Sequence, residues 1–270
     1  MKTVLRYTVL SVGAVVFAYP FLWMIAGSLR PELEIWNAWI WSEHFSSHSY
    51  QTVLTKIPLA RAFFNSCIVS CATTASVVLF GSMVGYALAR LKFVGAQTLY
   101  VLILFTMMIP FQIVLVPQYI LMVKLGLTDT YVALIAPTMM SAFSIVLFRQ
   151  FFLAIPQALI DAARMDGASE LTILFRLVWP LSRPVVITVA ILTFMTSWNE
   201  VLWPLMVVRD RSLMTMPQLV TIFTIGGEAE SQLGLLLAAA TMLALPVVLA
   251  YSFFQRYFIE SMAATGIKGG

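Results

Sequence analysis

The sequence predicts an all-α integral membrane protein with six transmembrane helices. Hydrophobic residues make up 61% of its 270 residues and charged residues 10%, whereas soluble domains have about 45–50% and about 25%. The mean hydropathy is +0.93. Six apolar runs reach the length of about 20 residues that a helix needs to cross a bilayer. We therefore expect a single membrane domain over residues 1–270, with no soluble domain.

Each apolar run is expected to be a helix, because a helix satisfies its backbone polar groups within the segment. The first run exceeds the apolar core of a signal peptide, which has about 7–15 residues, and shows no cleavage site, so we read it as a retained span. Prolines inside the runs predict kinks, although proline is also simply commoner in membrane helices. The runs are Val4–Leu29, Ala62–Ala89, Thr98–Val123, Tyr131–Leu153, Pro184–Leu205 and Leu233–Phe258, and the prolines are Pro20, Pro110, Pro117, Pro137 and Pro246.

Lysine and arginine predict the orientation. With a cytoplasmic N-terminus, ten of the 16 basic residues lie inside and six outside, as the positive-inside rule requires. The clearest signal is ARLK at 89–92, between the second and third spans. Both termini are therefore expected in the cytoplasm. The net charge of +4 comes from scattered basic residues, so it does not indicate nucleic acid.

Two segments that are expected outside the membrane contain aromatic or apolar residues. The segment 31–61 carries Trp36, Trp39 and Trp41, and tryptophan prefers the headgroup zone, so part of it is expected along the outer surface of the lipid. The apolar patch TMPQLVTIF at 215–223 is too short to span. It is read as a short helix at the interface or against an external partner.

Catalytic and metal-binding patterns are missing from the sequence. No G-x-x-x-x-G-K-[ST] loop occurs, so the chain is not expected to bind nucleotide phosphates. No Ser-His-Asp, Cys-His or H-E-x-x-H arrangement occurs either. Cys67 and Cys71 lie on one helix face and are read as structural, and no acidic or cysteine cluster joins His44 and His48. We expect no catalytic residue, no metal and no cofactor on this chain.

One charged stretch stands out in the predicted inner loop between spans four and five. Pro156 suits a first helical turn and Gly167 a left-handed helix end, so residues between them predict a short helix. A second helix is predicted to begin at the N-cap Ser169 and to stop before Pro180. Its apolar face needs a partner, either the spans or a groove in a cytoplasmic protein. That face comprises Ala168, Leu171, Phe175 and Val178.

The stretch DAARMDGASELTILFRLVWPLSRP resembles the coupling loop of ABC importer permeases. Ala162, Ala163, Gly167 and Pro180 match the family pattern in type and spacing, whereas Asp161 replaces its glutamate. Leu177 and Trp179 replace its isoleucine and leucine. The resemblance implies that residues 156–180 carry the contact with an ATPase. Asp161 and Asp166 are expected either to pair with donors on that ATPase or to support the loop's own helices.

The resemblance covers nearly the whole chain and favours the carbohydrate branch of these importers. Segments such as NSCIVSCATTASVVLFGSMVGYALARLKF, TSWNEVLWPL and the tail GIKGG are similar to that branch. It implies the six-helix type I permease architecture in the bacterial or archaeal cytoplasmic (inner) membrane. The implied partners are a second permease, two cytoplasmic ATPase subunits that hold ATP and Mg, and an extracytoplasmic solute-binding protein.

Polar residues within the spans are the candidates for the solute pathway or its gate. Glu200 is the foremost, because ionisable residues in a membrane are costly and suggest function, and Trp198 and Asn199 adjoin it. Its other reading is a cap or packing role. Gln112 and Gln118 are further candidates. The competing functions are a secondary carrier or channel and a membrane enzyme. A secondary carrier would need coupling carboxylates near the middle of the membrane, which are nearly absent from this sequence. A membrane enzyme would need a catalytic constellation, which the sequence lacks.

Overall fold

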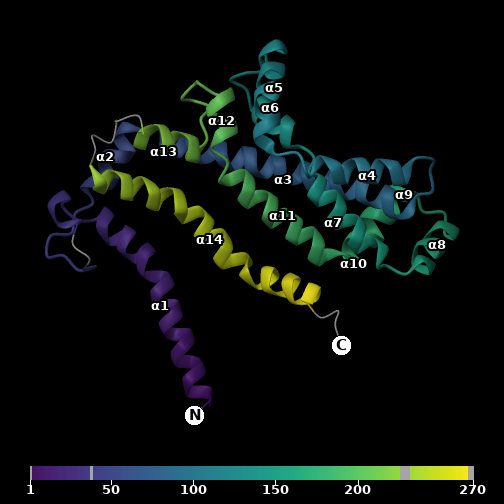
Figure 1. Cartoon of the computed structure of the whole chain (residues 1–270), viewed down its shortest axis with the longest axis horizontal. Helices are drawn as coiled ribbons and strands as arrows, with labels where there is room; N and C mark the ends of the chain where they lie inside the picture. The colour runs from purple at the N-terminus through teal and green to yellow at the C-terminus, as the bar shows by residue number, and fades with distance from the viewer. Residues whose placement is uncertain (1, 37–38, 226–231, 267–270) are drawn as a thin grey trace. The chain divides into compact units, whose positions relative to one another are not determined.

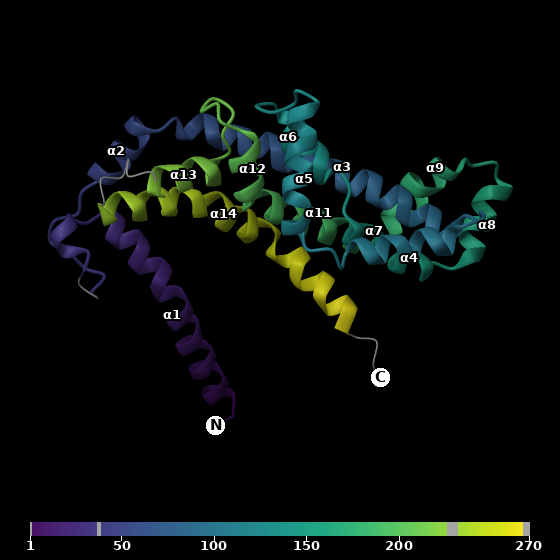
Figure 2. The same cartoon turned by 45° about the horizontal axis from the view of Figure 1, so that its top comes forward.

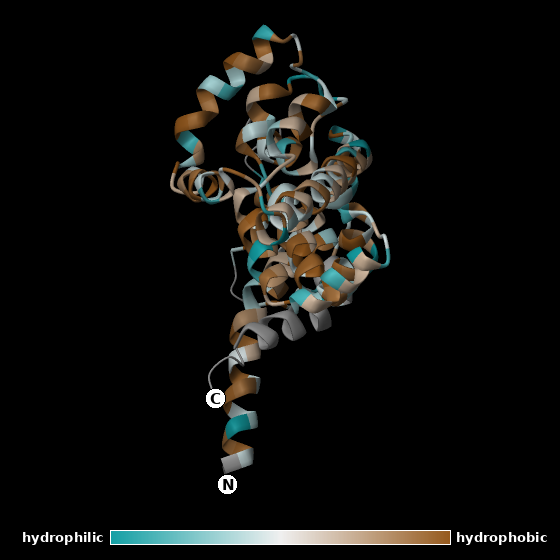
Figure 3. Cartoon of the chain, turned by 90° about the vertical axis from the view of Figure 1, so that its right-hand side faces the viewer, coloured by the Kyte–Doolittle hydropathy of each residue, from teal (hydrophilic) through white to brown (hydrophobic). Residues whose placement is uncertain are grey.

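The computed structural model describes residues 2–36, 39–225 and 232–266. Every regular element in this described part is a helix. Two helices, Thr3–Ser28 and Leu59–Arg90, are long and apolar enough to cross a membrane, and the count rises to five if each of three bent helix pairs is one span. Hydrophobic ribbon predominates along the helices in Figure 3. The all-helical membrane fold predicted from composition is thereby confirmed.

One compact unit comprises Met1–Phe63 and Thr215–Ala250. Its first helix, α1 (Lys2–Ser28), contains the first predicted span with Pro20 inside it, and is largely exposed. The other elements of this unit are the 3-10 helix η1 (Glu32–Glu34), α2 (His48–Lys56), α13 (Met216–Ile225) and the first part of α14 (Leu233–Gly266). The short helix predicted in 215–223 is present as part of α13, and its Leu219 and Phe223 are buried.

Glu32 and Gly27 fix the start of α14 and its packing in this unit. The two carboxylate oxygens of Glu32 accept the backbone N–H groups of Leu233 and Gly234 at 2.6 and 3.0 Å. A carboxylate at this position satisfies helix donors that have no partner in the helix itself. A Cβ on Gly27 would lie 2.7 Å from the side chain of Leu237, so α1 and α14 approach closely there.

The other compact unit comprises Phe64–Met214 and Tyr251–Gly270. It holds most of α3, which contains the second predicted span. Figures 1 and 2 show α12 beside α6, and contacts join α12 to both α5 and α6. The helices of this unit are α3 (Leu59–Arg90), α4 (Ala96–Thr106), α5 (Phe111–Lys124), α6 (Tyr131–Ile135), η2 (Ala136–Thr138), α7 (Ala142–Leu153), α8 (Gln157–Met165), α9 (Glu170–Ile173), the π-helical η3 (Leu174–Val178), α10 (Trp179–Leu181), α11 (Arg183–Trp198) and α12 (Leu202–Val207).

Three of the predicted spans are broken rather than continuous. The run Thr98–Val123 forms α4 and α5, which meet at 99°, because Pro110 lies at the N-cap of α5 in an extended conformation. The run Tyr131–Leu153 bends by 44° between η2 and α7. The fifth run ends its first helix at Trp198 and resumes at Leu202. Of the predicted kinks, those at Pro110 and Pro137 coincide with breaks, whereas Pro20, Pro117 and Pro246 lie inside helices.

Helices α3 and α7 approach closely through two glycines. A Cβ on Gly81 would lie 2.6 Å from the Ser144 hydroxyl, and one on Gly85 would lie 2.7 Å from the Cβ of Phe148. Small residues at such positions let helix backbones come together in a membrane protein. Beneath this contact lies a buried cluster in which Phe148 stacks on Phe152 at 5.5 Å between ring centroids. This cluster supports the loop 156–180.

Candidate functional site

Helix α8 exposes one side and buries the other, as a docking helix requires. Ile160 is fully buried and Ala163 packs against the buried cluster, whereas Asp161, Ala162 and Met165 are exposed. Met165 is 83% exposed. The two alanines of the motif therefore differ: Ala162 faces out, and Ala163 is partly buried and holds α8 in place.

The turn at Gly167 has the predicted left-handed geometry, with φ of +78°. The Gly167 N–H donates to the Arg164 carbonyl and the Ala168 N–H to the Ala163 carbonyl, both at 3.0 Å. These two bonds form the Schellman motif that ends many helices at a glycine. No atom lies within 4 Å of a Cβ built on Gly167, so only its backbone conformation, and not its packing, requires glycine.

The second helix begins as predicted but does not end as predicted. The Ser169 hydroxyl accepts the Thr172 N–H at 3.3 Å, which confirms the N-cap. The helix does not stop before Pro180: it continues through π-helical residues to Leu181, and then meets α11 at 88°. Pro180 occupies one of the first two positions of α10, where its missing N–H costs little. Pro180 itself is exposed.

The predicted apolar face of this helix is partly wrong. Val178 is fully buried, and Ala168 and Phe175 are partly buried, but Leu171 is 54% exposed. Ile173 and Leu174 are buried in its place. The π-helical turn holds more residues than an α-helical turn, so the inward-facing positions shift along the sequence.

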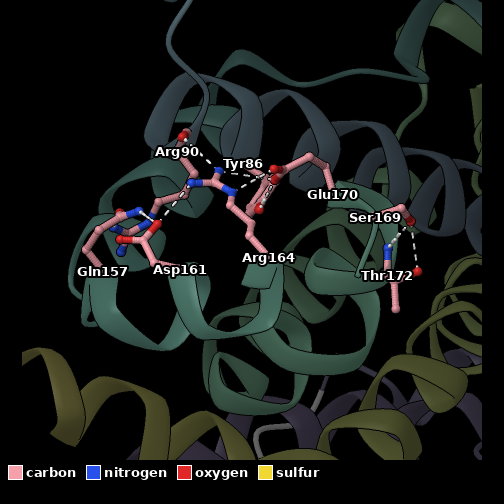
Figure 4. Close-up of polar contacts among 8 residues, drawn as sticks. All are labelled: Tyr86, Arg90, Gln157, Asp161, Arg164, Ser169, Glu170 and Thr172. Carbon is pink, nitrogen blue, oxygen red and sulfur yellow. Dashed lines mark hydrogen bonds and ion pairs between the residues drawn. The ribbon is translucent and has the colours of Figure 1, made fainter. Parts of the chain in front are cut away.

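A polar network ties the loop to the end of α3, and its central group is the Glu170 carboxylate (Figure 4). Tyr86 donates its hydroxyl to Glu170 Oε2 at 2.5 Å, and Arg164 donates Nε to Oε1 at 2.8 Å. The hydrogen bond from Arg164 is the main cause that holds the pKa of Glu170 below its usual range. The same bond raises the pKa of Arg164. Both groups are therefore charged at neutral pH.

Arg90 joins the start of α8 to the ends of α3 and α7. Its guanidinium donates to Gln157 Oε1 at 2.8 Å and also to the carbonyls of Phe152 and Ile155. Its own carbonyl accepts a bond from Arg164 Nη2 at 3.4 Å. In the sequence Arg90 indicates only the topology, because its partners in space follow it by more than 60 residues.

The two predicted docking carboxylates differ in their surroundings. Asp161 accepts Gln157 Nε2 at 2.9 Å and Arg164 Nη1 at 3.2 Å, so it supports its own loop while its side chain remains 52% exposed. Asp166 is exposed at the C-cap of α8. The internal role is thus visible for Asp161, and pairing with an ATPase stays a prediction for both residues.

The candidate pathway residues Trp198, Asn199 and Glu200 meet where α11 gives way to α12. Trp198 is 2% exposed and stacks on Phe194 at 5.8 Å between centroids. Asn199 is exposed, and its Nδ2 donates to the Met195 carbonyl at 2.8 Å. Glu200 Oε1 accepts the Trp203 N–H at 3.2 Å and so caps α12. Both the gating and the capping readings of Glu200 are compatible with this position.

The two glutamine candidates, Gln112 and Gln118, belong to α5. Gln112 is exposed and Gln118 is partly exposed. Helix α12 contacts α5, so the segment that follows Glu200 packs beside the helix that carries them. Their role in a pathway stays a prediction.

Sequence reasoning missed a set of residues that hold the turns near residues 129–131 and 209–214 together. Asn65, 2% exposed, donates to the carbonyls of Ser212 and Met214 and accepts the Tyr131 hydroxyl at 2.6 Å. Asp129 has a positive φ of 56° and accepts two N–H groups of the 209–210 segment. The one signal in the sequence that could have indicated this set was Asn65, a polar residue inside a predicted span.

Cys67 and Cys71 are free thiols, and His44 lies 3.4 Å from the Glu34 carboxylate. Among residues 2–36, 39–225 and 232–266, no group of three or more His, Cys, Asp or Glu side chains could hold a metal ion.

Comparison with known proteins places these features in a family. Residues 78–263 match the family described as "Binding-protein-dependent transport system inner membrane component". The chain is 37% identical over 262 residues to the arabinooligosaccharides transport system permease protein AraQ of Halalkalibacterium halodurans, with 95% of this chain and 93% of that one covered. It is 28% identical to the melibiose/raffinose/stachyose import permease protein MelC of Bacillus subtilis, with 93% and 91% covered.

Among solved structures, the chain resembles one chain in the crystal structure of a bacterial ABC transporter involved in the import of the acidic polysaccharide alginate. The TM-score is 0.82 at 23% identity, with 95% of this chain and 96% of that chain covered. At this identity the likeness concerns the fold. The broken helices described above therefore belong to a fold that recurs in an experimentally solved protein.

Proposed function

The chain belongs to the family of binding-protein-dependent transport system inner membrane components, and from this premise we propose that residues 156–180 couple it to an ATPase while its spans carry a sugar-class solute. It is the non-catalytic, multi-pass permease subunit of an ABC sugar or oligosaccharide importer in the inner membrane. Its family acts without a cofactor on the permease chain. ATP and Mg are assigned to partner ATPase subunits.

The exposed side of α8 is the observation that carries the coupling role. Ala162 and Met165 stand outward while Ile160 and Ala163 anchor the helix, and Gly167 turns the chain sharply behind it. A short helix with a small apolar outer side suits insertion into a groove of a partner protein. Asp161 and Asp166 flank this side, and Pro180 closes the loop.

The proposed assembly extends the ATPase and binding-protein partners that the family implies. A second permease completes the pathway, two cytoplasmic ATPase subunits bind the coupling loops, and an extracytoplasmic solute-binding protein delivers the solute. This chain acts as one permease domain over residues 1–270 with the six spans of a type I importer and both termini in the cytoplasm. The bent pairs over residues 96–124 and 131–153 then count as single spans, since broken helices are tolerated where they face protein or water.

Trp198, Asn199 and Glu200 are proposed to form the gate or wall of the pathway, with Gln112 and Gln118 as further polar contacts. Their support is the break between α11 and α12, where Glu200 caps the following helix. Arabino-oligosaccharides are the first solutes to test, because a permease named for them is the 37% identical relative.

Cross-linking tests the coupling role. Met165→Cys in a Cys67→Ala, Cys71→Ala background is expected to cross-link to the ATPase in the purified complex. The matched control is Val94→Cys, whose position is at least as exposed as Met165 (103% against 83%) but lies outside the loop, in the turn after α3. Cross-linking at Val94→Cys alone, or at neither position, contradicts the coupling role of α8.

Reporter fusions test the orientation. Fusions after Lys92 and after Arg176 are expected to report the cytoplasm, and a fusion near Ser46 the outside. An inside signal at Ser46 overturns the topology. The purified chain without its partners is expected neither to hydrolyse ATP nor to transport sugar.

A further inference from the structure

Three side chains from three helices form a clasp between the coupling loop and the inner end of α3. The clasp consists of Tyr86 on α3, Arg164 on α8 and Glu170 on α9, and all three point toward one another in Figure 4. Tyr86 is 3% exposed, with its ring edge-on to Phe152 at 6.4 Å between centroids. Its hydroxyl is therefore held by the buried cluster, while the carboxylate that it binds belongs to the loop.

We propose that Tyr86 is a positioning residue for coupling: its hydroxyl orients Glu170, which orients Arg164, so that displacement of α8 by the ATPase is passed to α3. The inference rests on the proposed contact of α8 with the ATPase and adds the route by which that contact reaches the membrane. Tyr86, Arg164 and Glu170 are not among the residues that match the coupling-loop motif.

The clasp supplies a rigidity that the backbone between α8 and α9 lacks. Along the backbone the turn at residues 166–169 joins the two helices, and no neighbouring group packs within 4 Å of a Cβ built at Gly167. A carboxylate that accepts charge-assisted bonds from two different helices restrains both in orientation as well as distance. The 2.5 Å separation between Tyr86 and Glu170 lies at the short end of such O–H···O⁻ bonds.

The other end of α8 is restrained by Arg90, which is also on α3. Its bonds to Gln157 and to the carbonyls at the end of α7 anchor the first turn of α8. Both ends of α8 are thus tied to the last two turns of one transmembrane helix. A load on α8 therefore reaches α3 through side chains, independently of the 67 to 74 residues of chain that separate the bonded residues of these two helices.

Tyr86→Phe separates this role from mere packing. The variant keeps the buried ring and removes one hydroxyl, and Arg164 still neutralises Glu170. Tyr131→Phe is the matched control, because it removes a tyrosine hydroxyl bond of 2.6 Å to Asn65 in the same unit but away from the loop. Glu170→Gln attacks the clasp from the loop side and serves as an independent second variant.

A cysteine in the turn at the end of α3 reports its movement without knowledge of the sugar. Val94→Cys in a Cys67→Ala, Cys71→Ala background provides the one cysteine of this chain, and the Val94 side chain is fully exposed in the turn after α3. The assay compares the rate of N-ethylmaleimide labelling at this position, followed by mass spectrometry, in the full complex with and without ATP and vanadate. Co-purified ATPase and the Met165→Cys cross-link are measured in parallel.

The expected result is a nucleotide-dependent change of labelling in the unaltered complex and in Tyr131→Phe. In Tyr86→Phe and Glu170→Gln this change should shrink by about 5-fold or more, the lower range of coupling between protein sites, with ATPase attachment retained. Unchanged nucleotide response in both clasp variants, no response in the unaltered complex, or loss of the ATPase from Tyr86→Phe overturns the proposal. In each of these cases, an intact Met165→Cys cross-link in the complex without clasp substitutions leaves the proposed coupling role of α8 standing. Absence of that cross-link refutes the coupling role as well.

Discussion

Replacing Gly167 by valine is expected to uncouple the importer while leaving its membrane insertion intact. Gly167 has φ of +78° at the end of α8, and no atom lies within 4 Å of a Cβ placed there. The substitution therefore introduces no clash with a neighbour. Its whole effect comes from the left-handed backbone conformation, which an L-residue with a branched Cβ disfavours.

The magnitude follows from that conformation. A left-handed residue other than glycine costs roughly 1–2 kcal/mol, and strained positions reach about 3 kcal/mol. A cost of one to two kcal/mol lowers the population of the native turn about 5- to 30-fold. The two Schellman bonds to the carbonyls of Ala163 and Arg164 break with the turn, so the exposed side of α8 loses its orientation.

The chain contains matched controls for this experiment. Gly95 has φ of +88° and also has no atom within 4 Å of a built Cβ, but it lies between α3 and α4, outside the loop. Gly95→Val therefore carries the same backbone cost at another site. Gly167→Asn keeps the position but uses a residue that tolerates the left-handed region, so it is expected to retain most of the coupling.

The assay purifies each variant complex with its second permease. Co-purifying ATPase is quantified, and ATP turnover stimulated by loaded binding protein and sugar uptake are measured. We expect Gly167→Val to weaken attachment or abolish stimulation, with Gly95→Val and Gly167→Asn close to the unaltered protein. If Gly167→Val keeps full ATPase binding, stimulated turnover and transport, the coupling role of residues 156–180 is wrong.

Three further predictions address other parts of the molecule. Gly85→Leu places a Cβ 2.7 Å from a phenylalanine side chain of α7 and should lower thermal stability in detergent by about 1–3 kcal/mol, whereas Gly13→Leu, with nothing within 4 Å, should not. Glu200→Ala removes the acceptor of the Trp203 N–H in the first turn of α12, a loss of about 1 kcal/mol, and should alter uptake with the ATPase still attached; detachment would contradict this. Because Arg164 lowers the pKa of Glu170, the contribution of Glu170 to stability is complete at neutral pH and is lost as the pH falls from the usual glutamate range through that lowered pKa; loss of amide protection in α8 already near pH 6 would contradict this sign.

Local signals allowed correct prediction of the class, the first two spans and the turn of the coupling loop. Long apolar runs must be helical in lipid whatever their partners, and α1 and α3 follow the predicted boundaries within a few residues. The αL glycine and the N-cap serine act through their own backbone and their immediate neighbours. Gly167 and Ser169 could therefore be assigned from the residues beside them.

The breaks in the later spans were only partly predictable. Proline removes a helix donor, but a neighbouring helix decides whether the chain bends or continues, and Pro110 and Pro117 in one run have opposite outcomes. The same holds for the π-helical turn before Pro180, which moves Leu171 outward and Ile173 inward. Periodicity alone assumes a regular helix and misses such a shift.

By itself the sequence determined that this protein is a helical membrane protein with a charged loop of two short helices, because hydropathy, capping and glycine conformation are properties of a residue and its near neighbours. Only the tertiary structure decided that Tyr86 faces Glu170 and that Glu200 caps α12. Tyr86 precedes its partner by 84 residues. Which distant groups meet depends on how helices pack, and a buried hydroxyl or carboxylate is stabilised only once that packing supplies its partner.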